Sequence, residues 1–169
     1  MSKTKLYAAI AAVIIVGTLS AAVGFSVSAE SQKHEFKARL QGFNEVPAIS
    51  STGSGTFKAR VSEDGTSIEF ELTYSDLESA VLAAHIHLGQ TDVNGGVSAF
   101  LCGGGGKPAC PASGTVTGTI TAANVIGPAG QGIAAGELDE LVAAMREGVT
   151  YANVHTTVRP GGEIRGQLK

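Results

Sequence analysis

The stretch Tyr151-Ala-Asn-Val-His-Thr156, followed by Gly161-Gly-Glu-Ile-Arg-Gly-Gln-Leu168, decides the fold, because it predicts two strands joined by a Pro-Gly turn. Alternate residues of a strand lie on opposite faces of its sheet. The polar residues of each strand therefore share one face: Tyr151, Asn153, His155 and Thr157 in the first, and Glu163, Arg165 and Gln167 in the second. The other face of the first strand is small and apolar.

An earlier segment has the same pattern. In Val81-Leu-Ala-Ala-His-Ile-His-Leu88, alternation places His85 and His87 on one face, with aliphatic side chains behind them. The polar faces of the three predicted strands together hold three of the four histidines in the chain.

Composition indicates an all-β fold. The chain has 169 residues, 43% of them hydrophobic, with 23 glycines and no tryptophan. Short runs rich in Thr, Val, Ile and Phe are separated by Gly, Asn and Asp, which is typical of a sandwich or barrel. We therefore expect one Greek-key β-sandwich of roughly eight strands. Its strands before the C-terminal pair are expected at residues 36–41, 56–62, 67–74, 81–88, 97–101 and 113–121.

One helix is expected in the folded part, over residues 136–147. Its apolar residues recur at helical spacing, and Gly148 follows as a stop signal. We expect this helix to pack against the sandwich as a cover, with ordinary core contacts made by Leu138, Leu141, Val142 and Met145.

The N-terminus predicts export. Lys3 and Lys5 precede an uncharged hydrophobic run from residue 6 to 27, expected to be helical, and small residues offer a cleavage site before Glu30. The run is also long enough to span a bilayer. Residues 1–29 are therefore expected to be a signal peptide or a membrane anchor, with a linker over 30–34 and the folded domain over 35–169 outside the cell.

Charge argues against a nucleic-acid partner. The formal net charge is -3, and without Lys3 and Lys5 it becomes about -5. We find no basic run, and no glycine loop followed by the Lys-Ser/Thr pair that cradles phosphate.

Two cysteines enclose a glycine-rich loop, Cys102-Gly-Gly-Gly-Gly-Lys-Pro-Ala-Cys110. In an exported protein they most simply form one disulfide between Cys102 and Cys110. The alternative is a metal pair, but no second cysteine pair or nearby histidine completes a zinc ligand set.

The sequence resembles the chordin-type (CHRD) domain family in five segments, in order, over roughly residues 35–169. They are Leu40-Gln-Gly-Phe-Asn-Glu-Val-Pro47, Ala84-His-Ile-His-Leu-Gly89, Cys110-Pro-Ala-Ser-Gly-Thr-Val-Thr-Gly-Thr119, Tyr151-Ala-Asn-Val-His-Thr156 and Gly161-Gly-Glu-Ile-Arg-Gly-Gln167. The resemblance implies an extracellular β-sandwich module and little about its activity. We expect a non-enzymatic binding module, whose partner would be an extracellular protein or glycan. Growth-factor binding is not implied, because in chordin it is credited to cysteine-rich repeats that this chain lacks.

The histidine faces suggest a metal site. Two strand residues at i and i+2 point the same way, so His85 and His87 can converge on one ion, and His155 from a neighbouring strand would complete the set. Three imidazoles without thiolate suit copper or zinc, with copper favoured by affinity. The alternative is a hydrogen-bonded cluster that fixes strand register, in which Asn153, Glu163 and Arg165 surround the histidines and Glu163 pairs with Arg165.

A second resemblance concerns this site alone. His85, His87, His155 and Arg165 are ordered like the copper ligands and active-site arginine of copper-zinc superoxide dismutase. The bridging histidine and the zinc-binding loop of that enzyme have no counterpart. We therefore expect a binding module first, a copper-dependent redox enzyme as the alternative, and a structural envelope component as a third reading.

Overall fold

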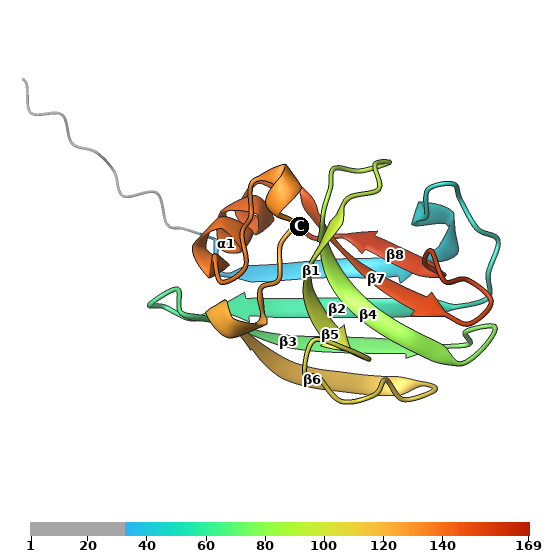
Figure 1. Ribbon diagram of the computed structural model, residues 1–169. Helices are drawn as coiled ribbons and strands as arrows, with labels where there is room; N and C mark the ends of the chain where they lie inside the picture. The colour runs from blue at the N-terminus through green and yellow to red at the C-terminus, as the bar shows by residue number, and fades with distance from the viewer. Residues whose placement is uncertain (1–32) are drawn as a thin grey trace, which may run out of the picture. The chain divides into compact units, whose positions relative to one another are not determined.

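The computed structural model describes residues 33–169, which form eight strands and one α-helix (Figure 1). The strands are β1 (Glu35–Gln41), β2 (Ser54–Val61), β3 (Ser67–Ser75), β4 (Val81–Leu88), β5 (Gly96–Cys102), β6 (Gly114–Thr121), β7 (Thr150–Thr156) and β8 (Ile164–Gln167). The helix is α1 (Leu138–Arg146), and short 3-10 turns span Gly42–Asn44 (η1), Ala122–Asn124 (η2) and Ala129–Gln131 (η3).

The strands form one antiparallel sheet in the order β5-β4-β7-β8-β1-β2-β3-β6. Figure 1 shows this sheet folded into two layers, with β4, β5 and β7 crossing in front of β1, β2 and β3. β3 and β4, β5 and β6, and β6 and β7 lie in different layers, so three connections pass between the layers, as in a Greek key. The all-β prediction, with about eight strands and one helix, is confirmed.

The two halves meet where β8 approaches β1. Gln41 pairs with Arg165 at one end, and the backbones of Lys37 and Lys169 hydrogen-bond at the other. Between them, a Cβ on Gly166 would collide with the carbonyl oxygen of Arg39. Glycine is therefore required here, because a side chain would force the two strands apart.

Alternation builds the core between the layers. Inward residues of β2 and β3 are buried, while the residues between them are exposed or half-buried. Each large aliphatic or aromatic side chain buried in this way contributes roughly 1.5–3 kcal/mol. The largest fully buried apolar side chains of the core are Phe36, Leu40, Phe57, Ile68, Leu72, Ile86, Leu101, Ile120, Leu141 and Met145.

The helix α1 covers one end of the sandwich, near the start of β1 (Figure 1). Its residues Leu138, Leu141, Val142 and Met145 are all buried and belong to the core. Acidic residues lie in its first turn and Arg146 in its last, which suits the helix dipole. The predicted helix and its packing role are confirmed, with a start two residues later than expected.

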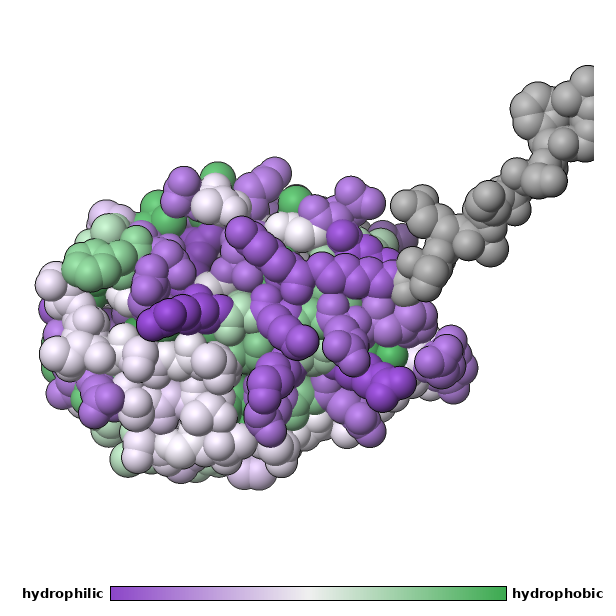
Figure 2. Space-filling view, turned by 180° about the vertical axis from the view of Figure 1, so that it is seen from behind, coloured by the Kyte–Doolittle hydropathy of each residue, from purple (hydrophilic) through white to green (hydrophobic). Residues whose placement is uncertain are grey.

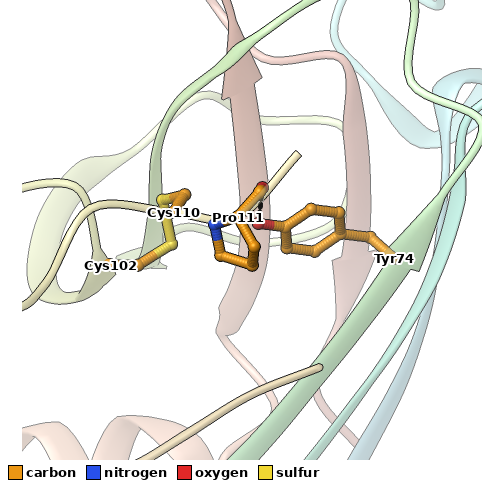
Figure 3. Close-up of a disulfide and its surroundings, with 4 residues drawn as sticks. All are labelled: Tyr74, Cys102, Cys110 and Pro111. Atoms are coloured by element: carbon orange, nitrogen blue, oxygen red, sulfur yellow. Dashed lines mark hydrogen bonds between the residues drawn. A yellow bond between two sulfur atoms is a disulfide. The ribbon is translucent and has the colours of Figure 1, made fainter. Parts of the chain in front are cut away.

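The disulfide between Cys102 and Cys110 is present, as predicted (Figure 3). The next residue is anchored too, because the hydroxyl of Tyr74 donates a hydrogen bond to the carbonyl of Pro111 over 2.7 Å. Burial raises the pKa of Tyr74 to about 12. The chain between the disulfide and β6 is thereby tied to the body of the sheet.

The predicted signal peptide or anchor over residues 1–29, and most of the predicted linker, lie outside the described residues. Within residues 33–169, no helix has the length and apolar character needed to cross a bilayer.

Candidate metal centre

The three predicted histidines meet on the outer side of the front layer. His85 and His87 come from β4 and His155 from β7, and these two strands are antiparallel neighbours. The ring centroids of His85 and His155 are 4.8 Å apart, and those of His87 and His155 are 5.6 Å apart. One nitrogen of each ring lies within 4.8 Å of the others. The strand pairing that the metal hypothesis requires is therefore present.

This face is not open to solvent, although it lies on the outer side of the sheet. His85, His87 and His155 are only 7–8% exposed, and every residue of β7 is buried. The cover comes from loops between strands. The segment 89–95 is tied to the segment after η1, because the Asn94 side chain donates to the Val46 carbonyl over 2.8 Å.

Two backbone carbonyls fix how the rings present their nitrogens. Nδ1 of His87 lies 3.0 Å from the carbonyl oxygen of Gly95, and Nδ1 of His155 lies 3.1 Å from that of Pro160. A carbonyl can only accept, so both Nδ1 atoms carry the proton and both Nε2 atoms keep a free lone pair. This is how outer hydrogen bonds orient metal-binding histidines.

Each of the three rings has at least one nitrogen without a hydrogen-bond partner. Among buried side-chain atoms of residues 33–169, Nε2 of His87, Nε2 of His155 and both ring nitrogens of His85 are unsatisfied. His85 is held instead by packing, with its ring edge-on to Phe100 at 4.3 Å between centroids. Unpaired buried polar atoms are costly, so a converging group of them calls for an explanation.

Burial keeps these rings neutral. Desolvation lowers the pKa of His85 to about 3 and that of His87 to about 4, and it also lowers the pKa of His155. For His85, the nearby imidazoles of His155 and His87 lower the pKa further. Neutral imidazole is the form that binds a metal ion.

A stack of three side chains leads away from the cluster. The ring of Tyr151 lies parallel to that of His87 at 4.8 Å, and the guanidinium carbon of Arg165 lies 3.4 Å from the Tyr151 ring centre. Gly95 fastens this stack, because its carbonyl accepts from His87 and its N–H donates to the Tyr151 hydroxyl over 3.1 Å. Predicted site residue Arg165 therefore reaches the histidines through Tyr151.

Asn153 leads to a residue that sequence reasoning missed. Its amide donates to Glu45 over 2.6 Å and to the carbonyl of Ile164 over 2.9 Å. Burial raises the pKa of Glu45 to about 7, although the hydrogen bond from Asn153 and the charge of Arg165 act to lower it. The sequence pointed to Glu45 only in that this residue lies within a segment, Leu40–Pro47, that resembles the CHRD family.

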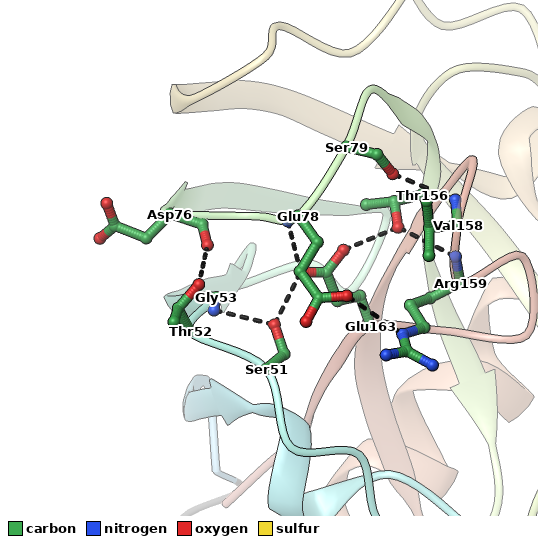
Figure 4. A network of polar contacts seen from close by, with 10 residues as sticks. All are labelled: Ser51, Thr52, Gly53, Asp76, Glu78, Ser79, Thr156, Val158, Arg159 and Glu163. Carbon is green, nitrogen blue, oxygen red and sulfur yellow. Dashed lines mark hydrogen bonds and ion pairs between the residues drawn. The ribbon is translucent and has the colours of Figure 1, made fainter.

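Glu163 has a different role from the one expected. Its Oε1 accepts from the Ser51 hydroxyl over 2.7 Å and from the Glu78 N–H over 2.8 Å. Its Oε2 accepts from the Thr156 hydroxyl over 2.7 Å (Figure 4). The predicted pair of Glu163 with Arg165 is wrong, because β8 begins only at Ile164 and the carboxylate turns toward these loops instead.

Arg165 binds neutral acceptors. Its guanidinium donates to the carbonyls of Gln90 and Val93 over 3.0 and 2.8 Å and to the Asn94 side chain over 3.2 Å. Arg165 thus holds the loop that supplies Gly95 to the cluster.

A family model described as the CHRD domain matches residues 36–168. The chain belongs to the CHRD domain family. No curated protein and no solved structure matches the chain. The segments by which the sequence resembled this family supply all three histidines, Tyr151 and Arg165, so they meet in space at one site of the CHRD domain.

The donor set of this CHRD domain fits copper or zinc. Imidazole nitrogens bind these ions at roughly 2.0–2.1 Å, so ligands around one ion lie about 3.3–3.6 Å apart. The widest pair here is 4.8 Å apart, so the rings must close by about an ångström when an ion binds. His85 has both nitrogens free, which leaves it the choice of donor atom.

Proposed function

We propose that this chain is an exported, non-enzymatic CHRD-domain binding module that holds one transition-metal ion on His85, His87 and His155. The observation that supports this most directly is the set of unsatisfied nitrogens on three neighbouring rings, two of them on rings whose opposite nitrogen is held by a backbone carbonyl. A register-fixing cluster would hydrogen-bond these atoms to one another or to protein groups.

Copper is the ion we favour. A site made only of imidazole nitrogens binds copper(II) more tightly than zinc in the general order of stability of divalent metals. Zinc remains the second choice, because three nitrogens and an open position also suit its tetrahedral preference.

Export is part of the proposal. A charged start followed by a hydrophobic run is the sequence support for it, and a disulfide is the structural support, since disulfides persist outside the reducing cytosol. The expected partner is an extracellular protein or glycan, and the expected membrane contact is the N-terminal segment where it is kept.

The test is metal titration of the full chain in detergent, with copper and with zinc, followed by metal analysis after removal of loose ions. We expect one ion per chain, lost in His85→Ala/His87→Ala. The fourth histidine provides the control, because His34 lies before β1 and outside the cluster, so His34→Ala should load normally. Equal loading of all three proteins would overturn the metal site. The isosteric pair His85→Gln/His87→Gln repeats the test in case the alanine variant does not fold.

A copper-dependent redox enzyme resembling superoxide dismutase is the second candidate. It is favoured by the cationic Arg165 stacked one ring away from His87, a position from which it could attract a small anion. Superoxide turnover by the copper-loaded chain, absent from the metal-free chain, would make this CHRD domain an enzyme. Loading without turnover would leave it a binding module.

A further inference from the structure

Cationic side chains gather where β1 and β8 meet. A pocket of about 390 Å³ at this seam is lined by Lys37, Arg39, Arg165 and Lys169, and its other lining residues include Phe43, Thr91 and Asp92. The pocket therefore has four cations against one side-chain carboxylate, in a chain whose formal net charge is -3. The layer that contains β1, seen from behind in Figure 2, is covered largely by hydrophilic side chains.

These cations are poorly neutralised within the domain. Arg165 donates to neutral acceptors, as described above, and among residues 33–169 neither Arg39 nor Lys169 makes a side-chain ion pair. Lys37 approaches Glu35 only at 3.9 Å, with both side chains about 70% exposed. A concave surface lined by one sign of charge concentrates the field and attracts ions of the opposite sign.

The pocket also has an exposed aromatic side chain that can stack on a sugar ring. Phe43 is 68% exposed, although it is a large apolar side chain, and it comes from η1 at the edge of this pocket. An aromatic ring beside cations offers a stacking surface for the apolar face of a sugar, and the cations can bind its acidic group. The hydroxyl of Thr91 adds a polar group at the same rim.

We propose that this pocket binds an anionic sugar residue of an acidic polysaccharide. In this assignment Lys37 and Arg39 hold the carboxylate or sulfate, Phe43 stacks on the ring, and Arg165 forms the positive floor. The inference deepens the proposed binding module by naming its partner class, and it does not depend on the metal.

The size of the pocket favours a charged sugar unit over a nucleic-acid backbone. Nucleic-acid binding grows with each phosphate neutralised, which requires cations spread over a longer surface than this pocket. A pocket of a few hundred cubic ångströms instead holds one or two sugar-sized groups.

The test is calorimetric or ligand-observed NMR titration of the full chain with oligomers of galacturonic acid, which carry carboxylates. Sulfated dextran oligomers test sulfate as the acidic group, and unmodified dextran oligomers test the sugar without charge. We expect binding of an acidic oligomer that weakens with salt and is at least tenfold weaker in Lys37→Ala/Arg39→Ala. Phe43→Ala should weaken it by a few-fold.

The matched control is Lys58→Ala/Arg60→Ala, which removes the same charge from the neighbouring strand outside this pocket. It should keep the affinity within about twofold, since exposed charges act weakly at a distance in salt. Equal losses in both double variants would overturn the proposal, as would equal binding of unmodified dextran or no binding of either acidic oligomer.

This result is separable from the metal test. Lys37→Ala/Arg39→Ala should still load one ion, and His85→Ala/His87→Ala should still bind the acidic oligomer. Failure of one proposal would therefore leave the other standing on its own measurement.

Discussion

At the scale of single residues, three buried neutral imidazoles make the stability of the metal-free protein depend on pH. Folded-state pKa values of about 3 for His85 and about 4 for His87 lie below the usual 6.5. Their contribution is complete above pH 6.5 and is lost as pH falls toward 4, because the unfolded chain takes up protons first. Glu45, with a folded pKa of about 7 against 4.5, acts oppositely, losing stability as pH rises through that window.

Three histidines outweigh one glutamate, so we predict that acidification destabilises the metal-free chain. A pKa shift of one unit corresponds to about 1.4 kcal/mol, so His85 and His87 together, less the opposing effect of Glu45, give a net loss of roughly 2 kcal/mol between pH 6.5 and 4.5, and the lowered pKa of His155 adds to this loss. Denaturant unfolding in the presence of a chelator, at intervals from pH 7 to 4.5, measures it. His85→Gln/His87→Gln should flatten the profile, and an unchanged profile in that variant would contradict the assignment.

Glu163 provides a second prediction at this scale. Its two oxygens join three separate segments through donors from Ser51, Glu78 and Thr156, and the side chain is fully buried. In Glu163→Gln, a side-chain NH2 group replaces one of the two accepting oxygens and faces a hydrogen-bond donor. We therefore expect a loss of about 2–4 kcal/mol in the free energy of unfolding.

Glu78, which lies beside Glu163 in Figure 4, provides the control for this prediction. Glu78 pairs with Arg159 at 3.2 Å, but both side chains are 30–39% exposed, so Glu78→Gln should cost less than about 1 kcal/mol. Thermal and denaturant unfolding of the two variants compare them directly. Similar losses of stability in both variants would show that the buried hydrogen bonds of Glu163 contribute no more than an exposed ion pair.

The residues that share one face of the sheet could be predicted from the sequence. The loops that cover that face could not. Period-two alternation placed His85, His87, Asn153 and His155 correctly, because it depends only on neighbours along one strand. Glu45 and Ser51 approach this region from a segment more than 100 positions away, and loop contacts of that kind leave no periodic trace. The expected Glu163–Arg165 pair failed for the same reason, since Glu163 lies just outside β8.

At the scale of elements, the disulfide loop forms part of the wall of the metal site. The glycines after Cys102 run across the Phe100 ring, where a Cβ on Gly105 would lie only 2.7 Å from a ring carbon. The other side of the contact is His85, edge-on to Phe100 at 4.3 Å between ring centres. The glycines are needed because a larger side chain would lift the loop from the ring.

We therefore predict that opening the disulfide loosens the metal site. Cys102→Ser/Cys110→Ser should lower the free energy of unfolding by about 2–3 kcal/mol, the cost of releasing a short loop. It should also speed the release of bound metal to a competing chelator, because Phe100 and His85 lose their support. Phe100→Leu, with the disulfide intact, should speed release without the full loss of stability. Identical rates of metal release in the disulfide-bonded protein and the serine variant would show that the disulfide loop does not support the metal site.

The elements themselves were largely predictable, and their pairing was less so. Strands β2 and β3 match the segments expected at 56–62 and 67–74, and they pair in full register. The approach of β8 to β1 and of β6 to β3 joins segments far apart in sequence, and no local pattern specifies it. The Greek-key order was expected from the arrangement that β-sandwiches generally adopt, and no single segment of the sequence specified it.

At the scale of the whole molecule, a metal ion would join the two strands at the centre of the front layer. β4 and β7 share seven register pairs, and both carry residues of the hydrophobic core on their inner faces. An ion held by His85, His87 and His155 therefore cross-links strands that unfold together with that core. Ligand binding to the folded state alone stabilises it by an amount set by free concentration and affinity.

We predict that copper raises the unfolding temperature of the chain in proportion to the logarithm of its free concentration. At a free concentration of one hundred times the dissociation constant, the gain should be about 2.7 kcal/mol. Buffered copper solutions and thermal unfolding at pH 7 measure it, and chelation should reverse it. His34→Ala should show the same gain, and His85→Ala/His87→Ala none. An equal gain in His85→Ala/His87→Ala and in the parent protein would mean that copper stabilises the fold by binding elsewhere. That result would contradict stabilisation through the three-histidine site.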